Sequence, residues 1–563
     1  MFIVISKLFA VFQAPLVRKS LNLIVEKLSD NTATKNLSWE LAEYGAYMVG
    51  AAVISGFFLF LTRQTIIVMS RKIEYDMKNE IFAHYLTLSP SFFKRNNTGD
   101  LMSRISEDVS KVRMYIGPGV MYGISLVVIS VTVISTMLSV NPWLTAIVLI
   151  PLPLLSISIY WVSSKLNKTS EQVQEKMASL STFVQEIFSG IRVIKSFSKE
   201  ETFAKQMEKE SAEYKKKALD LAKIQASFFP TIIFLIGFSV LLTVYFGGKL
   251  TIASTSAQFT PGNIAEFMLY LSMLTWPVTS IGWVTSIIQT ASASQKRINE
   301  FLSAQSELTS NGNISLDSIK KIEFKDVSFA YEDDPTNYVL KNINLTISQG
   351  QKLAVLGETG SGKSTLINLI GRMFDVSKGQ ILINDINIKE LNLSVYRKKL
   401  GFVPQDAFLF SDTIKGNLKF GNESASFEAI QRATKTTCVD DSILNFKEGY
   451  DTVIGERGVT LSGGQKQRIT ISRALLNNPE ILILDDSLSA VDTNTEHKIL
   501  TNLKKEIAQK TSLFVSHRVS TTKIADTIMI LKKGELVEKG EQQALLQYNS
   551  HFKKMYDQQI TTE

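Results

Sequence analysis

At 563 residues the chain is too long for one ordinary hydrophobic core, so we expect two or more domains. The formal net charge of +8 would suit a nucleic-acid partner, but there is no basic stripe with interleaved aromatic residues. The lysines gather beside apolar runs instead, which favours a membrane and no nucleic acid. Cys438 is the only cysteine, which excludes an intrachain disulfide and a thiolate metal cluster.

Six apolar runs in the first half of the chain predict membrane-spanning helices. They cover residues 2–17, 44–61, 120–138, 143–162, 228–246 and 264–288. The first is the weakest because Lys7 interrupts it. A signal peptide is disfavoured there, since the stretch has neither a charged n-region nor an A-x-A cleavage site. We therefore predict an all-α transmembrane domain of six helices over residues 1–299.

The distribution of basic residues orients these helices. Lysines and arginines crowd the segments after the second and fourth runs, whereas the opposite loops offer only Lys27, Lys35 and Lys249. By the positive-inside rule, both basic segments and both termini face the cytosol, as expected for a multi-pass protein of the plasma (inner) membrane.

The two basic segments have helical spacing of apolar residues and predict long arms that extend the spans into the cytosol. Pro90 and Gly99 break the first arm within residues 89–108, which predicts a short transverse helix at its tip. We expect the counterpart in the second arm at residues 196–205, "SFSKEETFAK".

A polar stretch, 300–319, predicts a linker to a second domain at 320–563. Within that domain "LAVLG" reads as a strand that enters "GETGSGKST", which matches G-x-x-x-x-G-K-[ST]. Backbone N–H groups of such a loop cradle phosphates at a helix N-terminus. Lys363 is then expected to reach the β- and γ-phosphates, and the Ser364 hydroxyl to ligate Mg²⁺.

Two further motifs extend the nucleotide site. In "LSGGQKQR" Ser462 precedes a predicted helix as its N-cap. The aliphatic run "ILILDD" reads as a buried parallel strand that delivers Asp485 and Asp486 to its C-terminal edge, where Asp485 can hold Mg²⁺. "TSLFVSH" reads as another buried strand and ends at His517.

The order of these motifs resembles that of ATP-binding cassette (ABC) domains. The Walker A motif, "FVPQDAFLF", "LSGGQ", "ILILDD", "SAVD" and "SHRVST" follow one another as in that family. Six spans with two cytosolic arms, ahead of one such domain, resemble a half-transporter of the ABC exporter type. The fold class implied is a multi-domain membrane protein, with the all-α transmembrane domain followed by an α/β P-loop NTPase domain. The opening helix departs from the family pattern, whose members usually have cytosolic residues before it.

The resemblance also implies a role for each motif residue. Tyr331 corresponds to the aromatic residue that stacks on adenine, and Gln405 to the glutamine that touches Mg²⁺ and senses the membrane domain. Glu456 and Arg457 correspond to the segment that contacts the arm tips, and His517 to the histidine on the γ-phosphate. Further ATP contacts are implied for Gly357, Thr359, Gly360, Ser361, Gly362, Lys363, Ser364 and Thr365 and, toward the partner's ATP, for Ser462, Gly463, Gly464 and Gln465.

Asp486 stands where the family generally has a glutamate that polarises the attacking water. One methylene fewer withdraws the carboxylate by about 1–1.5 Å, enough to lose a direct hydrogen bond to that water. The same substitution is common in the slower site of asymmetric ABC exporters. We therefore assign catalysis to Asp486, His517, Gln405 and Lys363, and expect weak ATPase activity from the chain alone.

The predicted function is ATP-driven export or flipping of an amphipathic drug or lipid by a dimer with a second exporter half. The alternative is a mainly ATP-binding, regulatory half of a heterodimeric peptide or metabolite exporter whose partner supplies most of the hydrolysis. The sequence leaves homodimer and heterodimer open. The membrane spans exclude a soluble P-loop ATPase of DNA repair or translation.

Overall fold

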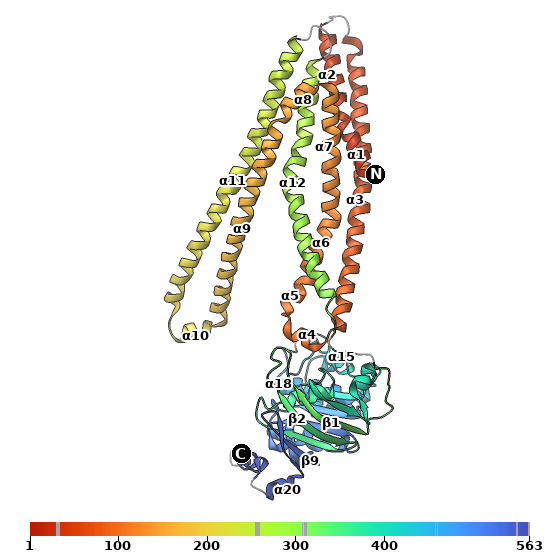
Figure 1. The fold of residues 1–563 in the computed structure, drawn as a ribbon, viewed down its shortest axis with the longest axis vertical. Coiled ribbons are helices and arrows are strands. Elements are labelled where there is room, and N and C mark those ends of the chain that lie inside the picture. Colours follow the sequence, from red (N-terminus) through yellow and green to blue (C-terminus); the bar gives the residue numbers. More distant parts are fainter. Residues whose placement is uncertain are drawn as a thin grey trace. The chain divides into compact units, whose positions relative to one another are not determined.

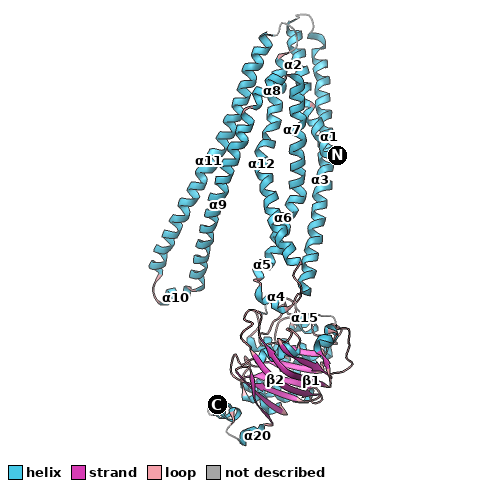
Figure 2. Cartoon of the chain, in the orientation of Figure 1, coloured by secondary structure: helices cyan, strands magenta, loops and turns pink. Residues whose placement is uncertain are grey.

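The chain folds into two compact units. The computed structural model describes residues 1–29, 34–253, 259–306, 308, 312–455, 458, 460–547 and 550–560. One unit comprises Met1–Leu86 and Gly99–Ala304, and the other Thr87–Thr98 and Gln305–Glu563. The first unit is helical, whereas the second combines strands and helices (Figure 2).

Helices of very different length make up the first unit. They are α1 (Phe2–Val11), α2 (Gln13–Ser29), α3 (Thr34–Thr87), α5 (Thr98–Ser103), α6 (Val109–Met114), α7 (Val120–Val140), α8 (Pro142–Leu149), α9 (Pro151–Ser189), α10 (Ile191–Ser196), α11 (Glu200–Ala253) and α12 (Pro261–Leu302). α3 and α11 each have 54 residues, which at 1.5 Å per residue makes each about 80 Å long. Such helices exceed the hydrocarbon thickness of a bilayer more than twofold, in agreement with the predicted arms.

Five helical segments of the described residues are long and apolar enough to cross a membrane. They are Phe2–Lys27, Leu37–Thr87, Thr98–Val140, Glu200–Ile252 and Pro261–Leu302. The fourth predicted span, 143–162, is divided between α8 and α9, and only the shorter apolar segment Pro142–Leu155 covers it. Pro151 explains the break, because proline lacks an N–H and starts a helix more readily than it continues one.

α9 and α11 lie side by side and form the second arm (Figure 1). Lys176 Nζ lies 2.6 Å from Glu213 Oε2, and Lys217 donates to Gln172 across the pair. The short helix of this arm is α10, which begins five residues before the predicted stretch 196–205 and shares only Ser196 with it. That prediction was wrong because Gly190 ends α9 early, while Ser198, with φ of 51°, forms the turn before α11. The first arm does contain a short helix, α4 (Pro90–Arg95), where Pro90 predicted it.

Polar contacts, one at the buried Glu266 and one between exposed side chains, fix α12 to other helices of the same unit. Glu266 is 1% exposed; it accepts hydrogen bonds from Arg18 of α2 at 3.1 Å and from Tyr270 at 2.9 Å. Near the other end of α12, Arg297 donates to Asp100 of α5 at 2.6 Å. A charge held within a membrane domain needs such a partner, since an unpaired one is costly there.

Two sheets build the second unit. Strands β1 (Lys321–Phe329), β2 (Leu340–Ser348), β4 (Lys378–Ile383) and β5 (Ile386–Asn387) form an antiparallel sheet in the order β2-β1-β4-β5. Strands β3 (Lys352–Leu356), β6 (Leu400–Val403), β7 (Ile481–Asp485), β8 (Thr511–Ser516), β9 (Thr527–Lys532) and β10 (Glu535–Gly540) form the other, in the order β10-β9-β3-β8-β7-β6. The four pairings from β9 to β6 are parallel, and β10 pairs antiparallel with β9.

The parallel sheet positions the site. Its strands β3, β7 and β8 are almost entirely buried, as their aliphatic sequences predict. Parallel strands end at a common edge, so the residues that follow β3, β7 and β8 meet there. Helices of this unit include α13 (Lys363–Ile370), α14 (Leu393–Lys398), α15 (Ile414–Lys419), α16 (Phe427–Thr436), α17 (Asp440–Leu444), α18 (Gly463–Leu476), α19 (Thr493–Glu506), α20 (Gln542–Gln547) and α21 (His551–Ile560).

Candidate nucleotide site

A glycine-rich loop connects β3 to α13. Gly362, the N-cap of α13, has φ of 98°, and a Cβ there would lie 2.7 Å from Leu340 Cδ2. A Cβ on Gly357 would lie 2.3 Å from the Leu531 carbonyl oxygen. Lys363 Nζ donates to the carbonyl oxygens of Gly357 and Glu358, at 2.8 Å each, and so spans the loop. Only glycine fits at Gly357 and Gly362. The loop can therefore form a cradle of backbone N–H groups.

Most of the predicted phosphate and metal residues line one cavity of about 210 Å³. Its described lining consists of Val339, Thr359, Gly360, Gly362, Lys363, Ser364, Thr365, Gln405, Asp485, Asp486 and His517. The helix N-terminus and the Lys363 ammonium both favour an anion. This part of the cavity therefore favours an anionic group, while Asp485 and Asp486 add carboxylates to the same lining.

Asp485 and Ser364 meet at the floor of this cavity. Asp485 is 6% exposed; burial raises the pKa of its carboxyl group, while a hydrogen bond from Ser364 and the charge of Lys363 oppose that shift. Burial likewise lowers the pKa of Lys363, against the carboxylates of Asp485 and Asp486. In the described part of the chain, no three His, Cys, Asp or Glu side chains form a metal cluster. The oxygen donors of Ser364, Asp485 and Gln405 suit Mg²⁺, a cation that shares its ligands with substrate phosphates.

Asp486 contacts His517 directly. The His517 Nδ1 lies 3.1 Å from the Asp486 carboxylate, and since a carboxylate only accepts, Nδ1 carries the proton of this bond. Asp486 has φ of 42°, and its backbone N–H donates to the Val515 carbonyl at 2.8 Å. Aspartate tolerates the left-handed region better than most residues. The backbone at this position therefore accommodates the short acid of this chain.

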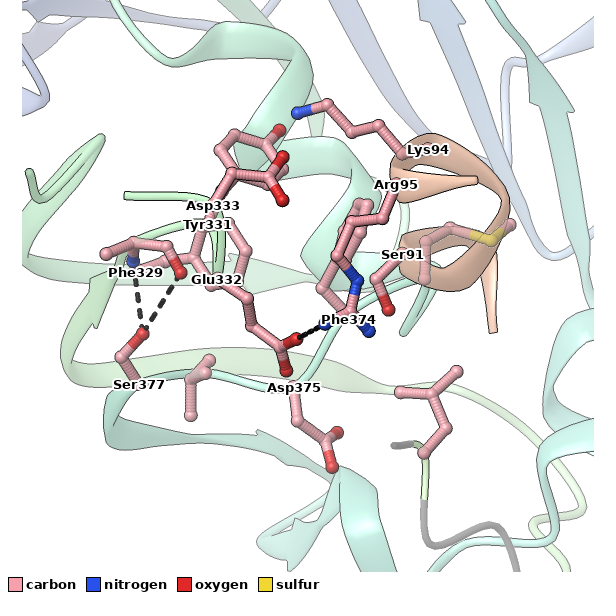
Figure 3. Close-up of a pocket in the computed structure, with 14 residues that line it drawn as sticks. Ser91, Lys94, Arg95, Phe329, Tyr331, Glu332, Asp333, Phe374, Asp375 and Ser377 are labelled. Carbon is pink, nitrogen blue, oxygen red and sulfur yellow. Dashed lines mark hydrogen bonds and ion pairs between the residues drawn. The ribbon is translucent and has the colours of Figure 1, made fainter. Parts of the chain in front are cut away.

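Tyr331 lies beside a second cavity, of about 250 Å³ (Figure 3). Its hydroxyl is 3.0 Å from Thr365 Oγ1, which ties the ring to the first turn of α13. The Lys94 ammonium of α4 lies 3.8 Å from the centre of the Tyr331 ring. Arg95 of the same helix forms a 2.7 Å ion pair with Glu332. α4 thus contacts the residue that the sequence assigns to adenine and its neighbour in the chain.

The signature residues lie at the N-terminus of α18 and are not among the described residues that line the 210 Å³ cavity. Ser462 Oγ accepts from the Gln465 N–H at 3.3 Å, and Gln465 Oε1 accepts from the Ser462 N–H at 2.9 Å. This reciprocal pair is a capping box, as the predicted N-cap requires. A Cβ on Gly464 would lie 2.8 Å from the Ala490 carbonyl oxygen. Glu456 and Arg457 lie outside the described residues.

Several residues around the site were given no role in the sequence analysis. Val339 lines the phosphate cavity just before β2. Gln467 of α18 donates to Ser489 Oγ at 3.1 Å and accepts from the Ala490 N–H at 3.0 Å, which joins the signature helix to the segment after Asp486. Arg518, next to His517, donates to Glu496 at 2.6 Å. The sequence signal for Gln467 and Arg518 was weak, because each is only an amide or charged residue one or two positions from a motif residue.

Comparisons with known proteins agree with this arrangement. The family model "ABC transporter transmembrane region" matches residues 1–278, and the model "ABC transporter" matches residues 340–489. The chain is 35% identical to the "Multidrug resistance-like ATP-binding protein MdlA" of Buchnera aphidicola subsp. Schizaphis graminum, over 96% of this chain and 92% of that protein. It is 36% identical to the "ATP-dependent lipid A-core flippase" of Syntrophus aciditrophicus, over 87% of this chain and 81% of that protein.

A solved structure shares the fold. The "Structure of a bacterial Atm1-family ABC exporter with ATP bound" superposes with a TM-score of 0.77 at 24% sequence identity, covering 99% of this chain and 96% of that chain. The likeness extends over both the helical and the strand-containing unit.

Proposed function

We propose that this chain, which belongs to the ABC exporter family of half-transporters, uses hydrolysis of Mg²⁺-ATP at the Lys363–Asp486–His517 cavity to move an amphipathic molecule across the plasma (inner) membrane. One observation carries the proposal. The lysine, the two aspartates and the histidine line one cavity at the C-terminal edge of the parallel sheet. The same chain provides five helices of membrane length among its described residues.

The phosphates of ATP are bound by the glycine-rich loop. On ligand entry the Lys363 ammonium exchanges its two carbonyl contacts for β- and γ-phosphate oxygens, which are stronger acceptors because they are charged. The N-terminal N–H groups of α13 point into the same space. Tyr331 stacks on adenine, and its bond to Thr365 fixes the distance between base and phosphate subsites.

Ser364, Asp485 and Gln405 are the residues that would hold Mg²⁺, because each offers an oxygen ligand to the cavity. The bound ion would neutralise charge on the phosphate oxygens during transfer. Asp485 would serve this role as a carboxylate; burial raises its pKa, and the hydrogen bond from Ser364 and the charge of Lys363 oppose that shift.

Asp486 is the group that orients the attacking water and accepts its proton. Its backbone N–H is bonded to the Val515 carbonyl, and its carboxylate contacts His517. His517 is 54% exposed toward the cavity and can turn from Asp486 to the γ-phosphate when ATP is present. The short reach of Asp486 makes this transfer slow, because a misplaced base loses much of its effect.

Half-transporters of this family dimerise, and the signature residues act in the partner's site. Ser462, Gly463, Gly464 and Gln465 close over the γ-phosphate of the ATP held by the other chain, so ATP joins two nucleotide domains. Closure changes the transmembrane cavity from inward-open to outward-open, and hydrolysis resets it, a population shift driven by differential binding. The nucleotide domain and both termini lie in the cytosol, on the side to which the positive-inside rule assigns the basic arms.

The substrate we propose is an amphipathic drug or lipid. Support comes from the names of relatives, a multidrug-resistance-like protein and a lipid A-core flippase. Asp486 favours a second candidate, in which this chain is the mainly ATP-binding half of a heterodimer and a partner performs most of the hydrolysis. In that case this chain's signature residues complete the partner's faster site.

Reconstitution in liposomes tests the proposal. Full-length chain and the Lys363→Ala variant are inserted into vesicles that contain a fluorescent lipid analogue, or are loaded with a lipophilic dye. The proposal predicts ATP-dependent movement of at least one probe by the wild type and none by Lys363→Ala. Equal movement by the two proteins would contradict it, and movement only after a partner half is added would favour the heterodimer.

A further inference from the structure

The C-terminal helix α21 reaches the loop that carries His517. The side-chain amide of Gln559 makes two backbone hydrogen bonds there. Its Nε2 donates to the His517 carbonyl at 2.7 Å, and its Oε1 accepts from the Val519 N–H at 2.7 Å. This pattern fixes which amide atom is nitrogen, because a carbonyl only accepts and an N–H only donates. One side chain, about forty residues away in sequence, therefore satisfies both backbone groups that flank Arg518.

α21 is anchored independently of Gln559. Phe552 is fully buried in an apolar cluster with Val519 and with side chains of β3 and β9. At the helix N-terminus, the Glu538 carboxylate accepts from the N–H groups of His551 at 2.6 Å and Phe552 at 3.1 Å. A buried phenylalanine and a capped N-terminus hold the helix against the sheet. Gln559 thus extends from a fixed support.

The opposite side of the same loop is held by Arg518. Its guanidinium donates to Glu496 at 2.6 Å and to the Ser489 carbonyl at 2.8 Å, and Ser520 donates to the other Glu496 oxygen at 2.6 Å. Arg518 itself has extended backbone angles. These side-chain contacts do not involve the His517 carbonyl or the Val519 N–H. Gln559 forms hydrogen bonds with both of those backbone groups. The backbone at His517 is held from both sides.

We infer that Gln559 is a positioning residue for His517 and that α21 is part of the hydrolytic machinery. The carbonyl bond fixes the peptide after His517, and so the direction in which its side chain leaves the backbone. That direction sets the contact between Nδ1 and Asp486. A misplacement of about 1 Å can already slow positioned chemistry strongly. The inference rests on the proposed function, because it gives Gln559 a role only where His517 acts on ATP.

Amide hydrogen exchange of the full-length chain gives the first test. Gln559→Ala should accelerate exchange in peptides that contain Val519 by about threefold or more, since a lost hydrogen bond exposes that N–H. Peptides of β7 should exchange as in the wild type. Lys554→Ala, an exposed change on the same helix, is the control and should alter neither. Unchanged exchange at Val519 would overturn the inference.

Steady-state ATP hydrolysis gives the second test. Gln559→Ala should lower kcat by about threefold to tenfold with KM for ATP unchanged. Gln559→Glu, which keeps the acceptor for Val519 but loses the donor to His517, should lower kcat similarly. In a His517→Ala background the Gln559→Ala change should cost nothing further, because the residue it positions is gone.

The outcomes separate the two claims. If His517→Ala is slow and Gln559→Ala is normal, only the positioning role fails. If Gln559→Ala still lowers kcat in the His517→Ala background, the residue acts on the fold in general, and the inference is overturned. If His517→Ala hydrolyses ATP at the wild-type rate, the role proposed for His517 fails and the inference fails with it.

Discussion

Glycine stands at the N-terminus of both α13 and α18, as the N-cap Gly362 and the first helical residue Gly463, yet the two ends are prepared for ligands in different ways. α13 starts after Gly362 in the left-handed region, and among the described residues no side chain caps it. α18 starts after Ser462, whose hydroxyl accepts the Gln465 N–H in a capping box. The N-terminus of α13 thus has no side-chain cap among the described residues, whereas Ser462 and Gln465 cap the N-terminus of α18.

The two helix N-termini also differ in the residues that surround them. Lys363, Asp485 and His517 line the cavity in front of α13, so that a phosphate finds a cation, metal ligands and a histidine in one place. None of the described residues that line that cavity comes from the α18 terminus. Under the proposed function, a phosphate reaches α18 as part of a nucleotide held by a second chain. The contrast gives a physical reason for dimerisation, because each helix end supplies what the other lacks.

The largest effect is expected at the α13 end. Lys363→Ala removes the charged donor of the phosphate cavity and should weaken ATP binding by about tenfold to a hundredfold. Binding of a fluorescent ATP analogue to the purified chain measures this. Lys398→Ala, an exposed lysine on α14, is the control and should bind normally. ATP affinity unchanged in Lys363→Ala would mean that the open helix end does not hold the phosphates.

At the α18 end, hydrolysis and binding should separate. Ser462→Ala removes the cap and should lower dimer ATPase activity about tenfold while ATP affinity stays within about twofold. Ser426→Ala offers a matched control, because Ser426 caps α16 through a hydrogen bond of the same length, 3.3 Å. Both variants should lose about 1 kcal/mol of stability, but only Ser462→Ala should lose activity. An equal loss of activity in both variants would mean that Ser462 acts only as a helix cap.

A smaller effect distinguishes capping from ligand contact at Gln465. Gln465→Glu keeps an acceptor for the Ser462 N–H, so the capping box and the unfolding temperature should be preserved. The added negative charge should repel the partner's γ-phosphate and lower ATPase activity by about threefold to tenfold. Gln465→Ala should show the reverse balance, a lower unfolding temperature with a milder loss of activity. Identical behaviour of the two variants would contradict this assignment.

Much of the site was predictable because its signals are local. The aliphatic runs ahead of Asp485 and His517, the glycines around Lys363 and the Ser462 cap each specify a short element, and the parallel sheet brings their ends together. Contacts between distant segments were not predictable. Gln559 meets His517 only because Phe552 seats α21 on the sheet, and no spacing in the sequence encodes that pairing.

Boundaries of helices were also missed for a physical reason. Pro151 divides a run of apolar residues that reads as one span, and Gly190 shifts the short helix of the second arm ahead of the predicted stretch. Hydropathy reports burial in a membrane but not where the backbone hydrogen-bond ladder is interrupted.

The comparison of wild type with Asp486→Asn and Asp486→Glu tests the central claim most directly, that Asp486 is the base of the α13 cavity. ATP hydrolysis and ATP binding are measured on the purified full-length chain, alone and with a partner half. The account predicts a weak wild-type rate, a loss of about a hundredfold or more in Asp486→Asn, a gain in Asp486→Glu, and nearly equal ATP affinity in all three. ATP hydrolysis by Asp486→Asn at the wild-type rate would contradict the account and would assign the chemistry to another residue or to the partner's site.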